Sequence, residues 1–278
     1  MELVSHRGKL ILRRMERNLL RLAAEPSREA VHDFRTTSRR LETLLNLLLP
    51  ARDRNQRKLL KLLSRIRRRA GRIRDIDVQL AALRSFKVLQ EPRRKTQLMQ
   101  RLIDLRVQHE QKLAKLLNKR TMTDLRKRLR RASQNLRATS CHDPLVVANE
   151  ILSSASTAGP LSDDILHRYR VAVKRARYAA EFAPRSAESD RFIAGLEHLQ
   201  DALGNWHDWM TLTRTASAHL GEIGESSLVA ALHNVTRVKF RHAVAALSVS
   251  RTGSFAGSPF ARTAKPAKRS GTPQSQAA

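Results

Sequence analysis

Two pairs of similar segments recur along the chain at an almost constant distance. Residues 31–41 read VHDFRTTSRRL and residues 166–176 read LHRYRVAVKRA, an offset of 135 positions. Residues 70–78 (AGRIRDIDV) and 203–211 (LGNWHDWMT) align at an offset of 133. Chance similarity between arginine-rich helices is the alternative, but two matches in the same order favour a duplicated unit, with one helical bundle in each half.

The rest of the sequence is typical of an all-α protein. Glycine and proline are scarce, and aromatic residues make up only 4% of the chain, a composition that favours helices over sheets. Apolar residues recur at helical spacing, as from Val31 through Phe34 and Leu41 to Leu48. The pattern predicts helices at about 2–24, 27–49, 52–86, 91–117, 121–137, 144–157, 162–183, 187–219 and 224–250.

Local signals support these boundaries. Ser27 and Ser162 precede helical segments as N-caps, and prolines fall at the expected breaks: Pro26, Pro50, Pro92, Pro160 and Pro184. We expect one domain over residues 1–250, with half one at about 1–140 and half two at about 141–250.

The tail, residues 251–278, changes character. It is rich in Ser, Gly, Pro, Lys and Arg and contains no acidic residue. Such a segment cannot bury enough apolar surface to offset its ordering entropy, so we expect a disordered basic tail. It could add non-specific phosphate contacts or serve only as a solubilising end.

The charge of the chain points to a polyanionic partner. Lys and Arg number 54 against 25 Asp and Glu, a formal net charge of +29, and 38 of the 54 lie in residues 1–140. A field of this strength recruits polyanions. Solubility alone is the alternative, but it would not require an excess this large.

Cations recur on one face of the two duplicated helices. His32, Arg35 and Arg39 stand at positions i, i+3 and i+7, and therefore share a face beside the apolar stripe. The second copy places the same types of residue at His167, Arg170, Lys174 and Arg177. A core-edge histidine bonded to the backbone is the alternative for either site, but the duplication favours phosphate binding, for which arginine supplies paired donors.

The helix that follows the first copy carries a basic edge over five turns. Its members are Arg54, Lys58, Lys61, Arg65, Arg68 and Arg72. Neighbouring like charges destabilise a helix by ~0.2–0.5 kcal/mol per pair, which a row of phosphates would offset. The equivalent helix of half two keeps only Arg191 and His198 on this edge, so we expect half two to bind more weakly.

The sequence offers no catalytic, metal or cofactor site. Asp75, Asp77 and Asp208 could be metal ligands or acid–base catalysts, but we prefer a structural role in which Asp75 and Asp208 pair with arginines or helix ends at a bend near the glycine. No Walker-type loop, HExxH or CxxC motif is present. Cys141 is the single cysteine, which excludes an internal disulfide.

Neither a membrane span nor a signal peptide is expected. No apolar run is long enough to cross a bilayer, and the N-terminal segment is charged throughout. We therefore expect a cytoplasmic protein.

The recurring motifs resemble those of the CHAD family of α-helical domains with characteristic histidines. Residues 31–41 and 70–78 resemble its VHxxRVxxRRxR and LGxxRDxDV patterns, and residues 166–178 and 199–208 resemble LHxxRxxxKRxRY and LQDxLGxxND. Glu42 departs from the pattern where a cation is expected, which weakens one side of a binding groove unless it pairs with a nearby arginine. The four motifs stand in order within residues 5–250.

The resemblance implies two four-helix bundles related by a pseudo-twofold axis, with a basic groove that binds inorganic polyphosphate. It implies a stand-alone module at polyphosphate granules, because the ExExK motif of the triphosphatase domain found in some relatives is missing. The phosphate ligands carried over by position are His32, Arg35, Arg39, Arg40, His167, Arg170, Lys174, Arg175 and Arg177.

Three classes of function follow from these observations. We expect non-catalytic binding of inorganic polyphosphate, with the basic edge at Lys58, Lys61, Arg65, Arg68 and Arg72 added to the site. A protein that binds nucleic acid non-specifically is the first alternative, although few aromatic residues are available to stack on bases. An enzyme acting on phosphate esters or anhydrides is the second, and it lacks a catalytic set.

Overall fold

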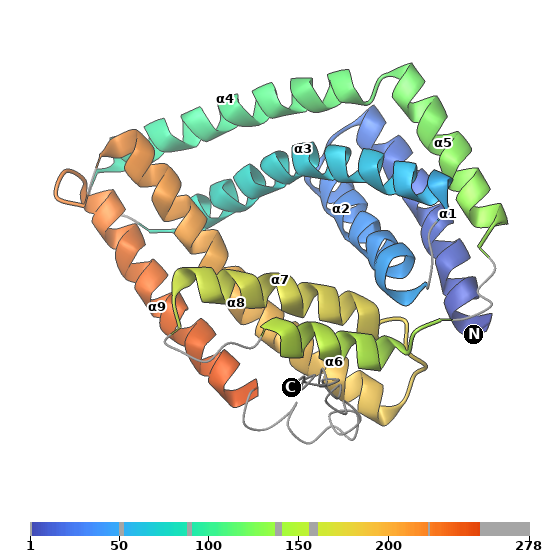
Figure 1. Cartoon of the computed structure of the whole chain (residues 1–278). Coiled ribbons are helices and arrows are strands. Elements are labelled where there is room, and N and C mark those ends of the chain that lie inside the picture. Colours follow the sequence, from blue (N-terminus) through green and yellow to red (C-terminus); the bar gives the residue numbers. More distant parts are fainter. Residues whose placement is uncertain are drawn as a thin grey trace, which may run out of the picture.

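The computed structural model is all-helical over the residues it describes, which are 2–49, 53–87, 91–136, 141–155, 161–221 and 223–250 (Figure 1). Its elements are α1 (Glu2–Ala24), α2 (Arg28–Thr43), the π-helical turn η1 (Leu44–Leu48), α3 (Arg54–Ser85), α4 (Pro92–Leu116), α5 (Lys119–Gln134), α6 (Pro144–Ala155), α7 (Asp163–Ala180), α8 (Ala187–Leu220) and α9 (Ser227–Val249).

Side-chain caps explain where several helices begin. Ser27 and Ser162 accept hydrogen bonds from backbone N–H groups at the starts of α2 and α7, which confirms both predicted caps. Asp53 and Ser186 form capping boxes at the starts of the two longest helices, α3 and α8. Each cap satisfies an N–H group that has no partner inside the helix. Pro92, the first residue of α4, needs no such partner.

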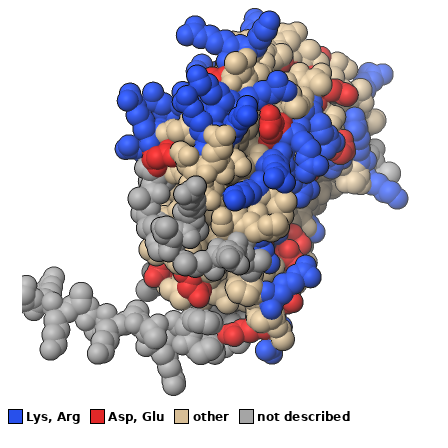
Figure 2. All heavy atoms as spheres, turned by 90° about the vertical axis from the view of Figure 1, so that its right-hand side faces the viewer, with Lys and Arg blue, Asp and Glu red and all other residues tan. Residues whose placement is uncertain are grey.

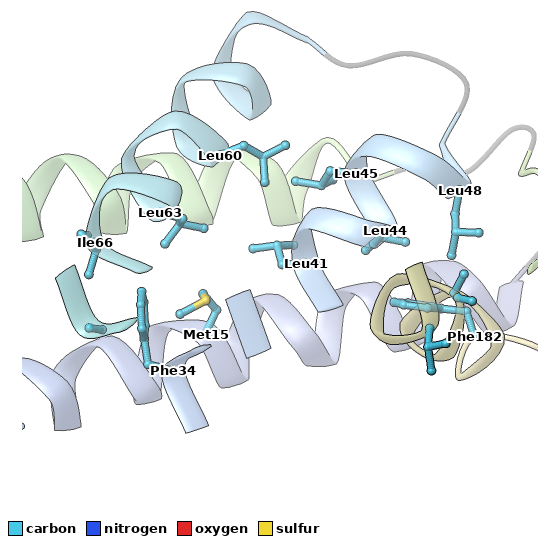
Figure 3. Close-up of a cluster of buried hydrophobic side chains, with 14 of the residues drawn as sticks. Met15, Phe34, Leu41, Leu44, Leu45, Leu48, Leu60, Leu63, Ile66 and Phe182 are labelled. Atoms are coloured by element: carbon cyan, nitrogen blue, oxygen red, sulfur yellow. The ribbon is translucent and has the colours of Figure 1, made fainter. Parts of the chain in front are cut away.

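The segment predicted as one helix over 27–49 ends differently. Its last turn, η1, widens so that the Leu49 N–H donates to the Leu44 carbonyl oxygen at 3.2 Å. The wider turn buries Leu44, Leu45 and Leu48 together. Figure 3 shows Leu48 next to Phe182, which follows α7, and Leu45 farther from it, near Leu60. Spacing alone does not predict this turn because a π turn interrupts the 3.6-residue period.

The helices pack in the order of the chain, and the order recurs. In the first part α1 packs on α2, α2 on α3 and α3 on α4, and in the second part α6 packs on α7, α7 on α8 and α8 on α9. The two parts meet where α2 contacts α7 and α3 contacts α8. Among the described elements α5 adds a further helix to the first part, where it packs on α1 and α3. The pseudo-twofold relation itself stays a prediction.

A shared core joins the two parts. One cluster of buried side chains includes Phe34 of α2, Leu63 of α3, Leu166 of α7 and Trp206 of α8. A second cluster fills the space where the C-terminal half of α3 and the start of α4 meet α8 and α9. Burial of apolar surface therefore holds the two halves to each other as well as stabilising each half.

None of the described helices is long and apolar enough to cross a membrane. The predicted disordered tail, 251–278, lies outside the described residues.

Candidate functional site

A groove of about 970 Å³ opens where α2 faces α7, and residues of α1, α3 and α8 complete its wall. Ten Lys and Arg side chains line it: Arg14, Arg35, Arg39, Arg40, Arg67, Arg74, Arg170, Lys174, Arg175 and Arg177. Four carboxylates also line it: Asp33, Glu42, Asp75 and Asp208. The lining therefore carries six more formal positive than negative charges, besides its three histidines.

Arg35 lies directly against α3 because Gly71 has no side chain. A Cβ atom on Gly71 would stand 2.3 Å from Nη1 of Arg35, closer than real Cβ contacts allow. The same Nη1 donates to the carbonyl oxygen of Arg67 at 3.2 Å. Gly204, the matching glycine of α8, has nothing within 4 Å of its Cβ position. The duplicated glycines thus have different surroundings.

Glu42 pairs with two arginines of the groove. It accepts hydrogen bonds from Nη1 of Arg39 at 3.2 Å and from Nη2 of Arg67 at 2.9 Å. Arg67 also donates to the Ser38 hydroxyl at 3.0 Å, and its side chain is only 9% exposed. Glu42 therefore orders this side of the groove while it lowers the local positive charge.

Glu181, just after α7, joins both halves at one end of the groove. Its carboxylate accepts two hydrogen bonds from Arg40, at 2.6 and 3.1 Å, and forms an ion pair with Nη1 of Arg177 at 2.9 Å. Both guanidinium groups also lie over the Tyr178 ring, at 5.7 and 4.9 Å from its centroid. Arg7 of α1 donates to the Glu181 carbonyl oxygen at 2.8 Å. Two predicted phosphate ligands are thus held in place by a carboxylate.

Arg170 occupies the corresponding position on α7 but is held more loosely than Arg35. Its Nη2 lies 3.9 Å from Asp208 of α8. Its Nε is buried and has no hydrogen-bond acceptor among the described residues. The rings of His167 and His207 lie 5.4 Å apart beside it.

The predicted structural role of the two aspartates agrees in part with this geometry. Asp208 pairs with Arg170, and Asp75 is stabilised in its charged form by Arg35. Enclosure by protein outweighs that attraction and raises the pKa of Asp75, although its side chain is open to the groove. Both α3 and α8 continue without interruption through these positions, so the expected bend is not accompanied by a break in either helix.

Burial and mutual repulsion make positive charge costly in the groove. Burial, followed by repulsion from Arg170, lowers the pKa of Lys174 to about 8. Burial is also the main reason why the pKa values of Arg35 and Arg170 are lowered, against the opposing effect of Asp75 and Asp208. The nearby carboxylates therefore offset only part of the effect of burial on these cations.

The histidines are biased toward their neutral forms. Burial, and then the neighbouring Arg74, lowers the pKa of His32. Burial, and then His207, lowers the pKa of His167. Both imidazoles therefore gain charge only below their ordinary pKa of about 6.5.

The structure brings together the nine predicted ligands that come from the two duplicated helices. They line one groove, from His32 to Arg40 on α2 and from His167 to Arg177 on α7. This reflects the packing of α2 against α7, which sets the two stripes face to face.

The five cations expected to extend this site do not line the groove. Lys58, Lys61, Arg65, Arg68 and Arg72 are all exposed on α3, on another face. Successive helical residues point ~100° apart, so Arg67 faces the groove while its neighbour Arg68 does not. These five cations therefore lie outside the groove, and their part in binding polyphosphate stays a prediction.

Sequence reasoning missed three cations that line the groove: Arg14, Arg67 and Arg74. Arg67 and Arg74 share a helical face with Gly71, at i−4 and i+3. The conspicuous glycine could therefore have identified the face of α3 that approaches α2. Arg14 carries no comparable signal.

The arrangement suits the binding of an extended anion. Convergent guanidinium groups and an ammonium group present many N–H donors to phosphate oxygens. Within the described part of the chain, no group of three or more His, Cys, Asp or Glu side chains could hold a metal ion.

Comparisons with known proteins place this fold and sequence in one family. The CHAD domain family model matches residues 9–217. The crystal structure of the CHAD domain from the plant Ricinus communis aligns with a TM-score of 0.61 and 19% sequence identity, covering 91% of this chain and 86% of that one. No curated protein matches the sequence. The family match covers well over half of the chain, which therefore belongs to the CHAD domain family.

Proposed function

We propose that the groove binds a chain of inorganic polyphosphate without chemical conversion. The observation that carries this proposal is the excess of six formal positive charges in one groove lined by both halves. A polymer with a negative charge on every unit would neutralise these cations along its length. Arginine suits this role because its planar fork grips phosphate oxygens through two parallel hydrogen bonds.

The electrostatics of the unliganded groove supports the same ligand. The lowered pKa values of Lys174, Arg35 and Arg170 mean that their charged forms are under-stabilised. Phosphate oxygens would stabilise those forms, and the buried Nε of Arg170 would gain an acceptor. Binding would therefore relieve a cost that folding imposes.

A non-catalytic role fits the state of the carboxylates. Glu42 is engaged by Arg39 and Arg67, and Asp208 lies beside Arg170. The oxygens of these two carboxylates are engaged by arginine side chains and are therefore poorly placed to exchange a proton with a bound phosphate. We propose a binding module that associates with polyphosphate granules in the cytoplasm.

Non-specific binding of nucleic acid is the second candidate, favoured by the exposed cations outside the groove, such as Lys58 and Arg65. Exposed cations such as these bind the phosphates of a DNA duplex without contacting its bases. The groove favours polyphosphate because α2 and α7 both contribute cations to it, so that a linear chain of phosphates in the groove would be contacted from two sides.

Equilibrium binding of labelled polyphosphate across a salt series tests the proposal. We expect log affinity to fall linearly with log salt, with a slope of about −4 if six charges are neutralised as on a single strand. Duplex DNA of equal total charge should compete poorly. Arg35→Gln with Arg170→Gln should lower the affinity at least tenfold, as expected when charge-assisted hydrogen bonds of ~1.5–3 kcal/mol are lost.

The matched control replaces two exposed arginines of the second half, Arg185→Gln with Arg237→Gln. It removes the same charge and should change the affinity less than twofold, since exposed charges contribute ~0–1 kcal/mol. Affinity that does not depend on salt, or equal losses in the two double variants, would contradict groove binding.

A further inference from the structure

The exposed edge of α3 forms a second basic surface outside the groove. Residues 54–74 contain ten Lys and Arg and no Asp or Glu. Lys58, Lys61, Arg65 and Arg68 are exposed, and none of them forms an ion pair within the part of the chain that the structure describes. In the groove, by contrast, carboxylates accompany the arginines.

This edge continues across to α4. His109 of α4 has a buried Nδ1 with no hydrogen-bond partner among the described residues. Burial, and then the charges of Arg72, Lys112 and Arg69, lowers the pKa of His109. Cations of α3 and α4 therefore converge around this imidazole. We use "outer face" for Lys58, Lys61, Arg65, Arg68, Arg69, Arg72 and Lys112.

Helix α5 extends the positive region beyond the start of α3. It carries seven Lys and Arg and a single acid, Asp124. It packs on α3, where Nδ2 of Asn55 donates to the Arg128 carbonyl oxygen at 3.0 Å. Figure 2 shows Lys and Arg side chains crowding the upper part of the side of the molecule on which α5 lies.

The geometry of the outer face suits a linear chain of phosphates. Its cations on α3 run from Lys58 to Arg72, about 21 Å along the axis at ~1.5 Å per residue, and all but Arg69 follow one another at axial steps of ~4.5–6 Å. Neither residues 54–74 nor α5 contains an aromatic residue, so there is no platform on which bases could stack. The outer face can therefore make electrostatic contacts to phosphates, but it has no aromatic side chain on α3 or α5 to stack on bases.

We propose that the outer face is a second polyphosphate-binding site, so that one molecule bridges two polyphosphate chains, or two parts of one long chain, through two different surfaces of α3. This rests on the proposed function, because the groove holds the first chain. Bridging is expected to condense long polyphosphate, which a protein with one site cannot do as a monomer.

The experiment compares five versions of the chain: the four described here and one that combines the outer-face and groove changes. The outer-face variant carries Lys58→Gln, Lys61→Gln, Arg65→Gln and Arg68→Gln, and glutamine preserves helix propensity at these exposed positions. The groove variant carries Arg35→Gln, Arg170→Gln and Lys174→Gln. The matched control carries Arg93→Gln, Arg185→Gln, Arg237→Gln and Arg241→Gln, four exposed arginines away from both surfaces. The wild-type chain is the reference, and circular dichroism verifies that each variant is folded.

Two measurements are made with polyphosphate as the probe. Titration calorimetry with short chains should count two bound chains per wild-type or control molecule and one per outer-face or groove variant. Light scattering with long chains should rise for the wild type and the control and stay at baseline for the outer-face variant. The fifth version combines the four outer-face changes with the groove changes. Its plot of log affinity against log salt should be less steep by about 3 than that of the groove variant, because four fewer cations neutralise phosphates.

The outcomes separate this proposal from the groove function. One short chain per wild-type molecule, lost in the groove variant, would refute the outer face while leaving the groove function intact. Normal condensation by the outer-face variant would also refute it, and an outer face that binds duplex DNA but no polyphosphate would be a nucleic-acid surface instead. No binding of polyphosphate by the wild type would overturn both proposals.

Discussion

Replacing Gly71 with alanine tests how closely Arg35 is held against α3. The added methyl group would stand 2.3 Å from Nη1 of Arg35, so the guanidinium group must move away. That movement breaks its 3.2 Å hydrogen bond to the carbonyl oxygen of Arg67. The obstacle is the end of a flexible side chain, so the helix itself need not shift.

Two opposing effects decide the change in stability. Alanine is favoured over glycine inside a helix by about 1 kcal/mol. Loss of a part-buried hydrogen bond from a charged donor costs about 1–2 kcal/mol. Gly71→Ala should therefore leave the free energy of unfolding unchanged or lower it by about 1 kcal/mol. Displacement of Arg35 should also weaken polyphosphate binding about fivefold, which corresponds to ~1 kcal/mol.

Gly204→Ala is the matched control because it has the same place in the repeat and open space around it. Only the helix-propensity gain applies there, so its melting temperature should rise by about 2–4 °C, with polyphosphate affinity unchanged. Thermal unfolding followed by circular dichroism, together with equilibrium binding, measures both variants. Equal stabilisation by the two substitutions, with wild-type binding in each, would refute the close approach of Arg35 to α3.

Three further predictions concern the charged residues of the groove. Glu42→Gln should tighten polyphosphate binding severalfold and lower the melting temperature by a few degrees, because Arg67 loses a charged partner while it stays nearly buried; looser binding would contradict this. Affinity should fall by up to tenfold per pH unit above pH 8, since Lys174 loses its proton there in the free protein and binding must restore it. In Lys174→Arg this decline should disappear, and its persistence would assign the titration to another group. The wild-type protein incubated with polyphosphate and Mg²⁺ should release no orthophosphate above background. Hydrolysis by the wild type that is lost in Asp75→Asn or Asp208→Asn would contradict this and would assign these carboxylates a part in catalysis.

The order and type of the helices could be predicted because local signals determine them. Apolar spacing, caps such as Ser27 and prolines such as Pro92 act within a few residues of each boundary. The π turn at Leu44–Leu48 could not be predicted, because it interrupts the helical period and its leucines join a buried cluster that includes Phe182, more than 130 positions away in the chain.

The residues that line the groove were predictable only where the repeat duplicated them. The stripes that begin at His32 and His167 face each other because α2 packs on α7, and the duplication indicated both. Periodicity placed Lys58 and Arg65 correctly on one edge of α3, but it does not say which element that edge faces. Glu181 was missed because its partner Arg40 lies 141 positions away.

The bonds from Arg7 to the end of α7 have a consequence for the biogenesis of the protein. Arg7 donates to the carbonyl oxygens of Glu181 and Ala183, separated from it by 174 and 176 positions. A ribosome adding about 5–20 residues per second needs roughly 9–35 s to cover that distance. Until α7 and Glu181 have been synthesised, the nascent N-terminal helices expose their arginines without the opposite wall of the groove and without the Glu181 carboxylate. A messenger RNA truncated before the codon for Glu181 would yield a cationic fragment in which the apolar side chains that pack against half two are exposed. We expect chaperones to bind this fragment or proteases to degrade it, and we do not expect it to bind polyphosphate with half the affinity of the whole chain.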